Sequence, residues 1–506
     1  MKLKDKVISC LFVFILITSG IIRFKQTSGN QTFFTYDQAR DMLDIRLLGE
    51  FKDLLVMGPT TSVNGLRLGP IYYYFNLPAY WLGGGNPMAL VNWNIIWFLI
   101  SGLVIFIFFR KRNLMLGFFV STLYLMAPQL FNITRYFWNA NVAVYFSVYY
   151  FLALWNYRDK KNIQSVFWLG ITSGILTQFE AAFGVVCILF SVLIIIINTG
   201  LKYWKSFLMG VIPWFVPQLA LEVKNRFQMT KLLFGIFTGQ NTILGSNFSI
   251  LETIISHIYT VRQFLEGQFI LPFGWGLSIF FLMVMSIIFF KKYRKYGLDY
   301  LGFLLFIFVF YIIFYRHSLK SWYLESLRVW YCFIVGIGLV SITKYKNILF
   351  TLFICLLLGN NWLIFKDQWK FTDKNESIDP KNLNNLIKNI DHVYEKMNGS
   401  GFKAYNYVPE IYDFSTNYLY WWYGQKKYGY MPDKISYSLS EVPRYIRNQD
   451  IFYEQTRKNQ EQKIALIYET RSMYQNWLGQ FDKYCIEDGW QAIWGTIVEI
   501  RKKCKD

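Results

Sequence analysis

One polar stretch near the start of the chain, residues 24–87, combines carboxylate and guanidinium side chains at helical spacing. Asp37, Asp41 and Asp44 are spaced four and three residues apart, so a helix would place them along one face, with Arg40 one turn after Asp37. A carboxylate can act as a general base, and a guanidinium group can donate two parallel hydrogen bonds to two oxygens of a phosphate. The spacing suits proton transfer beside a bound phosphate. It equally suits a solvated surface helix with no chemical role.

A second stretch in the same region combines glycine, proline and tyrosine. It runs Gly58-Pro59-Thr60-Thr61-Ser62 and then Gly65-Leu66-Arg67-Leu68-Gly69-Pro70-Ile71-Tyr72-Tyr73-Tyr74. Arg67 adds a second guanidinium group, whose fixed fork matches the geometry of a phosphate. The tyrosines could form a platform for a sugar or a prenyl chain. They equally fit the aromatic belt found where membrane helices enter water.

The elements that must position these residues are membrane helices. Of the 506 residues, 54% are hydrophobic, 20% are aromatic and only 17% are charged, whereas a soluble domain has about 45–50% apolar and about 25% charged residues. This composition excludes a soluble enzyme, a disordered protein and a disulfide-rich scaffold. Eleven apolar segments are each long enough to cross a bilayer: 7–23, 88–109, 114–132, 140–157, 162–179, 181–198, 206–222, 268–290, 298–315, 326–343 and 347–365. We expect a mainly α, polytopic transmembrane domain over 1–365, with 24–87 as its first external loop.

Basic residues decide the expected orientation. Alternate short connections, beginning with the N-terminus, carry seventeen Lys and Arg residues, whereas the short connections on the opposite side carry only Arg135, Arg316, Lys320 and Arg328. Because Lys and Arg gather in cytoplasmic loops, the N-terminus is expected in the cytoplasm and, after eleven crossings, the C-terminus outside. The net charge of +20 then follows largely from topology, so the bilayer is an expected partner and nucleic acid is not.

The tail, 366–506, is polar and has the size of one domain. Three runs rich in β-branched and aromatic residues are expected to form strands: 402–408, 463–468 and 496–500. Two segments with helical periodicity are expected to form helices: 380–397 and 410–428. We therefore expect a small α/β domain, external like the C-terminus itself.

Cysteine and histidine spacing offers no metal site. The six cysteines form no CxxC pair, and the three histidines stand 60 and 75 residues apart. The three aspartates of the first loop could hold a hard divalent cation through oxygen ligands, but no essential metal is expected. His317 is expected to be an ordinary interfacial residue. Cys485 and Cys504 could pair in the tail, and the sequence leaves this open.

Four stretches carry a resemblance to a known family: Tyr36-Asp37-Gln38-Ala39-Arg40, Leu68-Gly69-Pro70-Ile71-Tyr72-Tyr73-Tyr74, Arg135-Tyr136-Phe137-Trp138-Asn139-Ala140-Asn141 and Pro217-Gln218-Leu219-Ala220-Leu221-Glu222-Val223-Lys224-Asn225. They resemble motifs of membrane glycosyltransferases with the C-type (GT-C) fold, the superfamily of protein O-mannosyltransferases and the lipid A aminoarabinose transferase. Within it, the chain is most similar to the bacterial dolichyl-phosphate-mannose–protein mannosyltransferase-like group. It departs from the pattern at Gln38, where many members have Glu, and at Ala140, where Pro is usual.

The resemblance implies an inverting hexosyl- or pentosyltransferase of the bacterial plasma membrane, which moves a sugar from a polyprenyl-phosphate donor to an acceptor hydroxyl at the external face. Asp37 would be the base, with Asp41 as a second candidate acid. The implied donor-phosphate ligands are Arg40, Arg67, Arg135, Arg316 and Arg328. The implied sugar or lipid platform is Tyr36, Tyr72, Tyr73 and Trp138. Whether the acceptor is a glycan, a glycolipid or a protein stays open.

Two other functions are alternatives: a transporter or flippase, and a polymerase or ligase for polyprenyl-linked glycans. A transporter needs ionisable groups near the bilayer midplane, whereas the centres of the expected spans are nearly free of charge and the acids gather at their outer ends. A polymerase or ligase would share the arginine-rich outer face. It would not be expected to carry an acidic loop directly after the first span.

Overall fold

The computed structural model describes residues 3–61, 65–238, 250–267, 275–313, 315, 319–342, 366, 377–408, 412–439, 456, 462–470 and 474–504. The chain forms two compact units. We call the first the helical unit; it comprises Met1–Phe24, Leu55–Phe75 and Trp93–Lys370. We call the second the mixed unit; it comprises Lys25–Leu54, Asn76–Asn92 and Phe371–Asp506.

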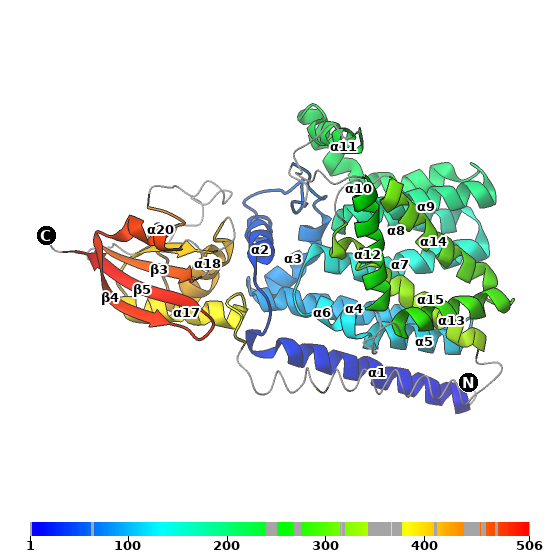
Figure 1. Ribbon diagram of the computed structural model, residues 1–506, viewed down its shortest axis with the longest axis horizontal. Helices are drawn as coiled ribbons and strands as arrows, with labels where there is room; N and C mark the ends of the chain where they lie inside the picture. The colour runs from blue at the N-terminus through cyan, green and yellow to red at the C-terminus, as the bar shows by residue number, and fades with distance from the viewer. Residues whose placement is uncertain are drawn as a thin grey trace. The chain divides into compact units, whose positions relative to one another are not determined.

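The helical unit is a bundle of apolar helices (Figure 1). It holds all or most of α1 (Leu3–Thr27), α4 (Pro87–Arg110), α5 (Leu114–Met126), α6 (Pro128–Ile133), α7 (Asn139–Lys160), α8 (Ile163–Phe179), α9 (Ala181–Thr199), α10 (Trp204–Lys224), α11 (Gln228–Thr238), α12 (Ile250–Glu266), α13 (Trp275–Phe289), α14 (Arg294–Ile313), η3 (Ser321–Leu324) and α15 (Leu327–Ile342). Helix α3 (Ile71–Gly83) is divided between the two units.

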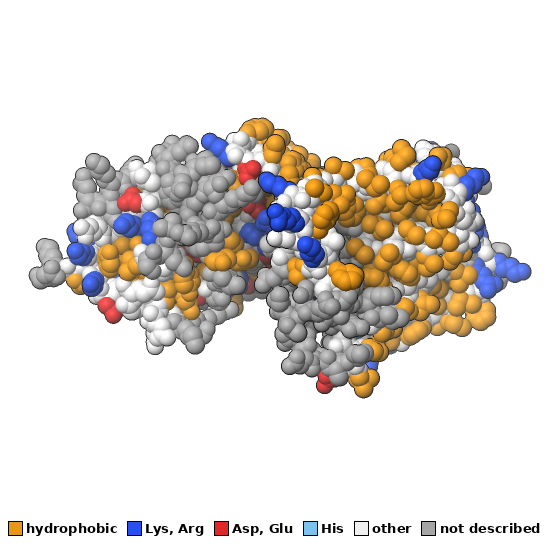
Figure 2. Space-filling model, turned by 90° about the horizontal axis from the view of Figure 1, so that it is seen from above, with side chains coloured by type: hydrophobic (Ala, Val, Ile, Leu, Met, Phe, Trp, Pro, Cys, Tyr) orange, Lys and Arg blue, Asp and Glu red, His pale blue; other side chains and the backbone are white. Residues whose placement is uncertain are grey.

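Six of the described helices are long and apolar enough to cross a membrane: Asp5–Asn30, Pro87–Arg110, Ala181–Thr199, Trp204–Lys224, Arg294–Ile312 and Ser321–Ile342. Large apolar side chains such as Ile197 and Met209 lie exposed on their outer surface, and hydrophobic side chains cover much of the face of the bundle seen in Figure 2. The predicted multi-pass membrane architecture is thereby confirmed. The number of eleven spans stays a prediction, and the expected span 347–365 lies outside the described residues.

Glycines allow the helices of the bundle to approach closely. Gly170 of α8 and Gly210 of α10 face each other's backbones: a Cβ atom on Gly170 would lie 2.4 Å from the carbonyl oxygen of Phe207, and one on Gly210 would lie 2.5 Å from that of Phe167. Small residues at such crossings are typical of membrane helices, where packing rather than hydrophobicity drives association. This crossing fixes α8, a helix that also lines the groove described below.

The mixed unit combines helices with a five-stranded sheet (Figure 1). Its strands are β1 (Lys403–Tyr407), β2 (Lys434–Ser436), β3 (Lys463–Glu469), β4 (Tyr484–Gln491) and β5 (Thr496–Lys503), in the order β2-β1-β3-β5-β4. Strand β1 pairs in parallel with β2 and β3, and β5 pairs antiparallel with β3 and β4. The principal helices are α2 (Tyr36–Gly49), α17 (Leu383–Met397), α18 (Phe414–Leu419), η4 (Tyr420–Gly424), α19 (Gln425–Tyr428) and α20 (Tyr474–Leu478).

The expected α/β character of the tail is confirmed, and the predicted helix 380–397 appears as α17. The strands predicted at 402–408, 463–468 and 496–500 appear as β1, β3 and β5, because each run is rich in the β-branched and aromatic residues that strands favour. The sequence did not predict β2 or β4. Strand β4 is a mostly exposed edge strand, and its apolar signal is correspondingly weak. A disulfide joins Cys485 of β4 to Cys504, which answers the question left open by the sequence.

Helix α2, which carries the aspartates, is built into the mixed unit. The backbone of Thr32 accepts a hydrogen bond from Leu383, and Phe34 donates one to Lys381, so the strand-like stretch before α2 pairs with the start of α17. At the other end of α2, the guanidinium group of the buried Arg46 lies 3.3 Å from the centre of the Trp421 ring. The orientation of α2 is therefore set by residues more than 300 positions later in the chain.

Candidate active site

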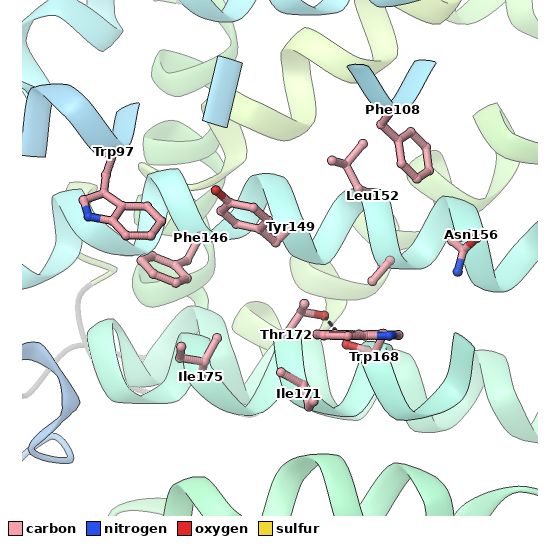
Figure 3. Close-up of a pocket in the computed structure, with 11 residues that line it drawn as sticks. Trp97, Phe108, Phe146, Tyr149, Leu152, Asn156, Trp168, Ile171, Thr172 and Ile175 are labelled. Carbon is pink, nitrogen blue, oxygen red and sulfur yellow. Dashed lines mark hydrogen bonds between the residues drawn. The ribbon is translucent and has the colours of Figure 1, made fainter. Parts of the chain in front are cut away.

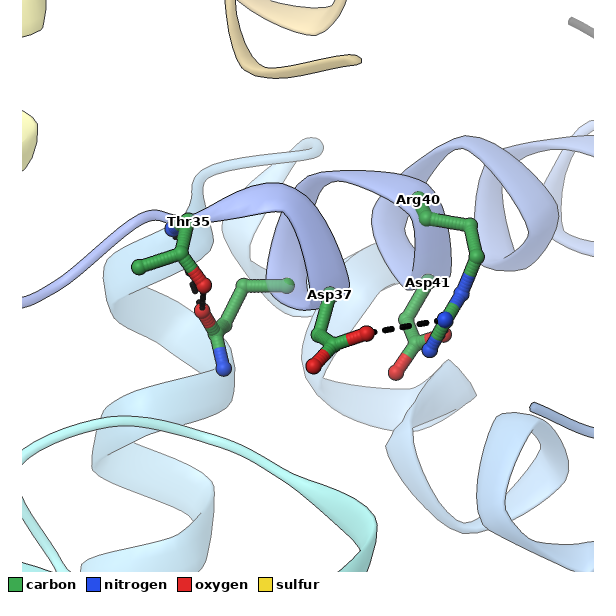
Figure 4. Close-up of polar contacts among 5 residues, drawn as sticks. Thr35, Asp37, Arg40 and Asp41 are labelled. Carbon is green, nitrogen blue, oxygen red and sulfur yellow. Dashed lines mark hydrogen bonds and ion pairs between the residues drawn. The ribbon is translucent and has the colours of Figure 1, made fainter. Parts of the chain in front are cut away.

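The first turn of α2 is fixed by a capping interaction. The backbone amide of Thr35 donates to Oε1 of Gln38 at 3.0 Å, and the Thr35 hydroxyl contacts the same oxygen (Figure 4). An amide side chain three residues into a helix is typical of such a cap. Gln38, where the related motif has Glu, thus has a local structural role, which leaves Asp37 as the exposed acid of this turn.

Arg40 joins Asp37 and Asp41 into one charged cluster (Figure 4). Its Nη1 donates to Asp37 Oδ1 at 2.8 Å, while Nε and Nη2 donate to Asp41 Oδ1 at 3.0 and 2.8 Å. The Asp37 side chain is 41% exposed, whereas those of Arg40 and Asp41 are 11% and 0% exposed. Only Asp37 therefore offers a carboxylate that a substrate can readily reach.

The buried position of Asp41 changes its acidity. Burial raises the pKa of Asp41 to about 7, although the adjacent Arg40 guanidinium opposes that change. A carboxyl group that loses its proton near neutral pH is suited to proton exchange, and such shifts gather at functional sites. Asp41 is 0% exposed, so any effect of its proton on a substrate would have to pass through Arg40 and Asp37.

Aromatic residues from the C-terminal part of the mixed unit lie beside this cluster. The ring of Tyr36 is 4.8 Å from that of Phe414 and 6.4 Å from that of Tyr412, and it is 5.9 Å from the Arg40 guanidinium. Burial raises the pKa of Tyr36. Sequence reasoning selected Tyr36 but missed Tyr412 and Phe414. Their only sequence signal is an aromatic-rich segment, and that does not reveal which distant residues it meets.

Arg67 lies in the helical unit, on a hairpin. Gly58 donates to the carbonyl of Leu68 and Leu68 donates to that of Pro59, both at 2.9 Å, and Thr60 faces Arg67 as an antiparallel pair. Within the described residues, the Arg67 Nε atom is buried and has no hydrogen-bond partner. A buried guanidinium nitrogen without a partner carries a desolvation cost that an anionic ligand would relieve.

The other predicted residues of the helical unit have varied surroundings. Tyr72 and Tyr73 are fully buried, whereas Trp138 is partly exposed and packs edge-on against Trp322 at 5.8 Å. Burial lowers the pKa of Arg135. Arg328 forms an ion pair with Glu325, and its Nη2 donates to Glu325 Oε1 at 2.9 Å. Arg316 and His317 lie outside the described residues.

Oxygen and nitrogen ligands do not gather into a metal site in the described part of the chain. No group of three or more His, Cys, Asp and Glu side chains is placed there to hold an ion. The carboxylates of Asp37 and Asp41 are instead turned toward Arg40. The expectation of a metal-independent protein stays a prediction.

Comparison with known proteins identifies a solved structure that has the same fold. The sequence matches no protein-family model and no curated protein. Among solved structures, ArnT from Cupriavidus metallidurans in the apo state matches over 97% of this chain and 98% of that chain, with a TM-score of 0.59 and 11% identity. The same ArnT bound to undecaprenyl phosphate matches over 97% of both chains, with a TM-score of 0.59 and 13% identity. The chain has the fold of ArnT.

The ArnT fold confirms the predicted GT-C architecture. An oligosaccharyltransferase from Archaeoglobus fulgidus, in complex with Zn and sulfate, also matches, over 96% of this chain and 72% of that chain, with a TM-score of 0.46 and 12% identity. The narrower resemblance to the dolichyl-phosphate-mannose–protein mannosyltransferase-like group stays a prediction.

An apolar groove lies among three helices of this ArnT-like bundle (Figure 3). It has a volume of about 470 Å³ and is formed by α4, α7 and α8. Its walls are largely aromatic: Trp97, Phe108, Phe146, Tyr149 and Trp168, with Leu152, Ile171 and Ile175 between them. A groove of this composition suits a hydrocarbon chain and offers little to a polar ligand.

Proposed function

We propose that this protein is an inverting glycosyltransferase that moves a sugar from a polyprenyl-phosphate donor to an acceptor hydroxyl at the external membrane face. The observation that carries the proposal is Asp37, an exposed carboxylate held by Arg40 at the start of a helix of the mixed unit. The ArnT fold supports the choice of donor, because one ArnT structure holds undecaprenyl phosphate.

Asp37 is the proposed base. As the acceptor oxygen bonds to the anomeric carbon, its proton passes to the Asp37 carboxylate. The bond between the anomeric carbon and the phosphate oxygen breaks, and its electron pair leaves with the polyprenyl phosphate, which needs no proton. A single displacement of this kind inverts the anomeric centre. A positioned base contributes about 10²–10⁴-fold to such a step. Arg40 is a positioning residue here, since its donors already hold Asp37 and Asp41.

The donor phosphate is assigned to guanidinium groups of the helical unit, with Arg67 first and Arg135 second. Arg67 ranks first because its Nε atom is buried without a partner in the described part of the chain. We assign the prenyl chain to the aromatic groove among α4, α7 and α8 (Figure 3). Its aromatic walls would pack against the double bonds and methyl groups of isoprene units.

Arg67→Ala is expected to raise the donor KM about 10- to 100-fold, because a hydrogen bond to a charged group contributes about 1.5–3 kcal/mol. Arg67→Lys should recover only part of this loss, since an ammonium group lacks the planar, paired donors with which a guanidinium group binds two phosphate oxygens. The measurement is transfer from a synthetic polyprenyl-phosphate sugar over a range of donor concentrations. Arg112→Ala is the matched control. Arg112 pairs with Asp159 close to the C-terminal ends of α4 and α7 and is not assigned to the phosphate site. Equal donor KM values for Arg67→Ala and Arg112→Ala would remove Arg67 from the phosphate site.

Asp41→Asn is expected to change how stability depends on pH. An unfolded Asp titrates near pH 4, whereas burial raises the pKa of Asp41 to about 7 in the folded protein. Between these values the folded chain keeps a proton that the unfolded chain has lost, so wild-type stability falls as pH rises through this window. Asn cannot titrate. The melting temperature of the variant relative to wild type should therefore rise between pH 4.5 and 7.5, and a constant difference would contradict the assignment.

The mixed unit is assigned to the external side of a bacterial plasma membrane, in line with the distribution of basic residues. Its disulfide between Cys485 and Cys504 supports this side, because disulfides persist in oxidising compartments. A reporter that is active only outside the cytoplasm, fused after Asp506, should be active. The same fusion with a reporter active only in the cytoplasm should be silent, and a signal from it would overturn the topology.

The enzymatic proposal is tested first in membranes. Membranes from cells that overproduce the protein should consume a polyprenyl-monophosphate sugar and release polyprenyl phosphate, whereas membranes from cells without it should not. Equal consumption by the two preparations would contradict the proposal. Glycan analysis of a deletion strain would then identify the natural acceptor.

A further inference from the structure

The C-terminal part of the mixed unit places two aromatic rings at the proposed catalytic helix. Tyr412 and Phe414 flank Tyr36, the residue directly before Asp37 in the chain, at ring distances of 6.4 and 4.8 Å. Phe414 is buried, whereas Tyr36 and Tyr412 are half-buried and keep accessible surface. The Tyr36 and Tyr412 rings are inclined by only 22° to each other. Two partly open, nearly parallel rings thus stand next to the exposed carboxylate.

Hydrogen bonds hold this aromatic segment in place. Asp413, between the two rings in the chain, is fully buried, and its Oδ2 accepts from Asn406 Nδ2 of β1 at 2.7 Å. The Asp413 carbonyl accepts from Thr416 Oγ1 at 3.0 Å and from Asn417 Nδ2 at 3.1 Å. The turn is therefore anchored both to the sheet and to the first turn of α18. A surface held in this way is preorganised, which lowers the entropic cost of binding a ligand.

The charge of the neighbouring cluster limits what binds there. Asp37 and Asp41 bring two carboxylates and Arg40 one guanidinium, so the ionised cluster has a net negative charge. Arg40 donors are already directed at the carboxylates. Hydroxyl groups can donate hydrogen bonds to the exposed Asp37 oxygens. A ligand with hydroxyl groups on its rim and C–H bonds on its faces fits both features, because C–H faces pack on the electron-rich faces of aromatic rings.

We propose that Tyr36 and Tyr412, supported from within by the buried Phe414, form a binding subsite for a sugar ring of the acceptor, so that the acceptor is a saccharide and not a protein. The inference rests on the proposed function in one respect, the assignment of Asp37 as base. A pyranose ring packed against Tyr36 and Tyr412 would present a hydroxyl to Asp37. A serine or threonine side chain carries a hydroxyl but no ring, so it would leave these aromatic faces unused.

The test compares Tyr412→Leu with Tyr412→Phe in the full-length protein, in a detergent without a sugar headgroup. Leu removes the aromatic face and Phe keeps it. Tyr412→Leu is expected to raise the acceptor KM for methyl pyranosides about tenfold, which at about 1.4 kcal/mol for each factor of ten is the upper end of the range for an aromatic contact. Tyr412→Phe should stay within about threefold of wild type.

A matched control replaces an aromatic residue elsewhere on the mixed unit. Trp490 is half-buried on β4 and stacks on His392 at 4.8 Å, and Trp490→Leu should leave the acceptor KM unchanged. Where Tyr412→Leu fails to fold, Tyr36→Leu tests the facing ring of the same subsite. An unchanged acceptor KM in the Leu variants would overturn the subsite. Transfer to serine- or threonine-containing peptides but to no glycoside would overturn the saccharide acceptor.

Direct binding separates this inference from the proposed function. Saturation-transfer NMR of methyl pyranosides with the wild-type protein should give a signal that Tyr412→Leu loses and Trp490→Leu keeps. If the wild-type protein neither hydrolyses nor transfers a polyprenyl-phosphate sugar, the proposed function is wrong, and the NMR comparison still decides the subsite. If transfer occurs and Tyr412→Leu binds and uses glycosides like wild type, only the subsite is wrong.

Discussion

Asp37→Asn is expected to lower kcat by about 10²-fold or more while leaving folding and donor KM largely unchanged. Asn has nearly the size of Asp and can still accept a hydrogen bond from Arg40, which is 2.8 Å from Asp37 Oδ1 in the wild type. It cannot accept the proton of the acceptor hydroxyl. The loss should therefore fall on turnover and not on binding, which is the behaviour of a group that acts in the transition state.

The internal control for this variant is Asp44→Asn, because Asp44 lies on the same helix and is not assigned a catalytic role. It should change activity by less than about tenfold, a scale below that of a general base. The assay is transfer from a synthetic polyprenyl-phosphate sugar in detergent, with donor binding and thermal stability measured on the same preparations. Turnover by Asp37→Asn at the wild-type rate would show that Asp37 is not the base.

Arg40→Ala is expected to have the second-largest effect, because it removes the partner of both carboxylates. Asp41 is fully buried, and removing one partner of a buried ion pair costs about 3–5 kcal/mol. Part of this cost should appear as lower thermal stability. The rest should appear as lower kcat/KM, since Asp37 loses the contact that fixes its carboxylate. Both effects should be measurable in one protein preparation.

Arg40→Lys distinguishes positioning from simple charge. An ammonium cannot reproduce three donors aimed at Asp37 and Asp41, so Lys should rescue activity poorly. The double variant Arg40→Ala/Asp41→Asn removes the buried charge and should recover stability without recovering kcat/KM. Wild-type activity in Arg40→Lys would instead mean that Arg40 contributes only its positive charge.

Local features of the site followed from the sequence. The pairing of Arg40 with Asp37 could be predicted, because residues three apart on a helix lie on the same face. The strands β1, β3 and β5 could be predicted for a similar reason, since their β-branched and aromatic content is a property of consecutive residues. Helix α17 follows from its periodicity and its N-terminal Asn382 cap, whose side chain accepts from Asn384.

Non-local features did not follow from the sequence. The contact of Arg46 with Trp421 and the flanking of Tyr36 by Tyr412 join residues about 375 positions apart, and no local pattern specifies such a pairing. The complete burial of Asp41 depends on the same packing, because the helix alone would leave its three aspartates equally solvated. For this reason the sequence could not rank the three acids by exposure.

The central claim is that the donor is a polyprenyl monophosphate sugar, and purified protein tests it most directly. Matched polyprenyl monophosphate and diphosphate sugars, offered to the same preparation in detergent, separate a transferase of this kind from a polymerase or ligase. We predict consumption of the monophosphate donor, release of one polyprenyl phosphate for each sugar transferred, and an inverted linkage in the product. Consumption of the diphosphate donor alone, or of neither donor by protein shown to be folded, would contradict the account.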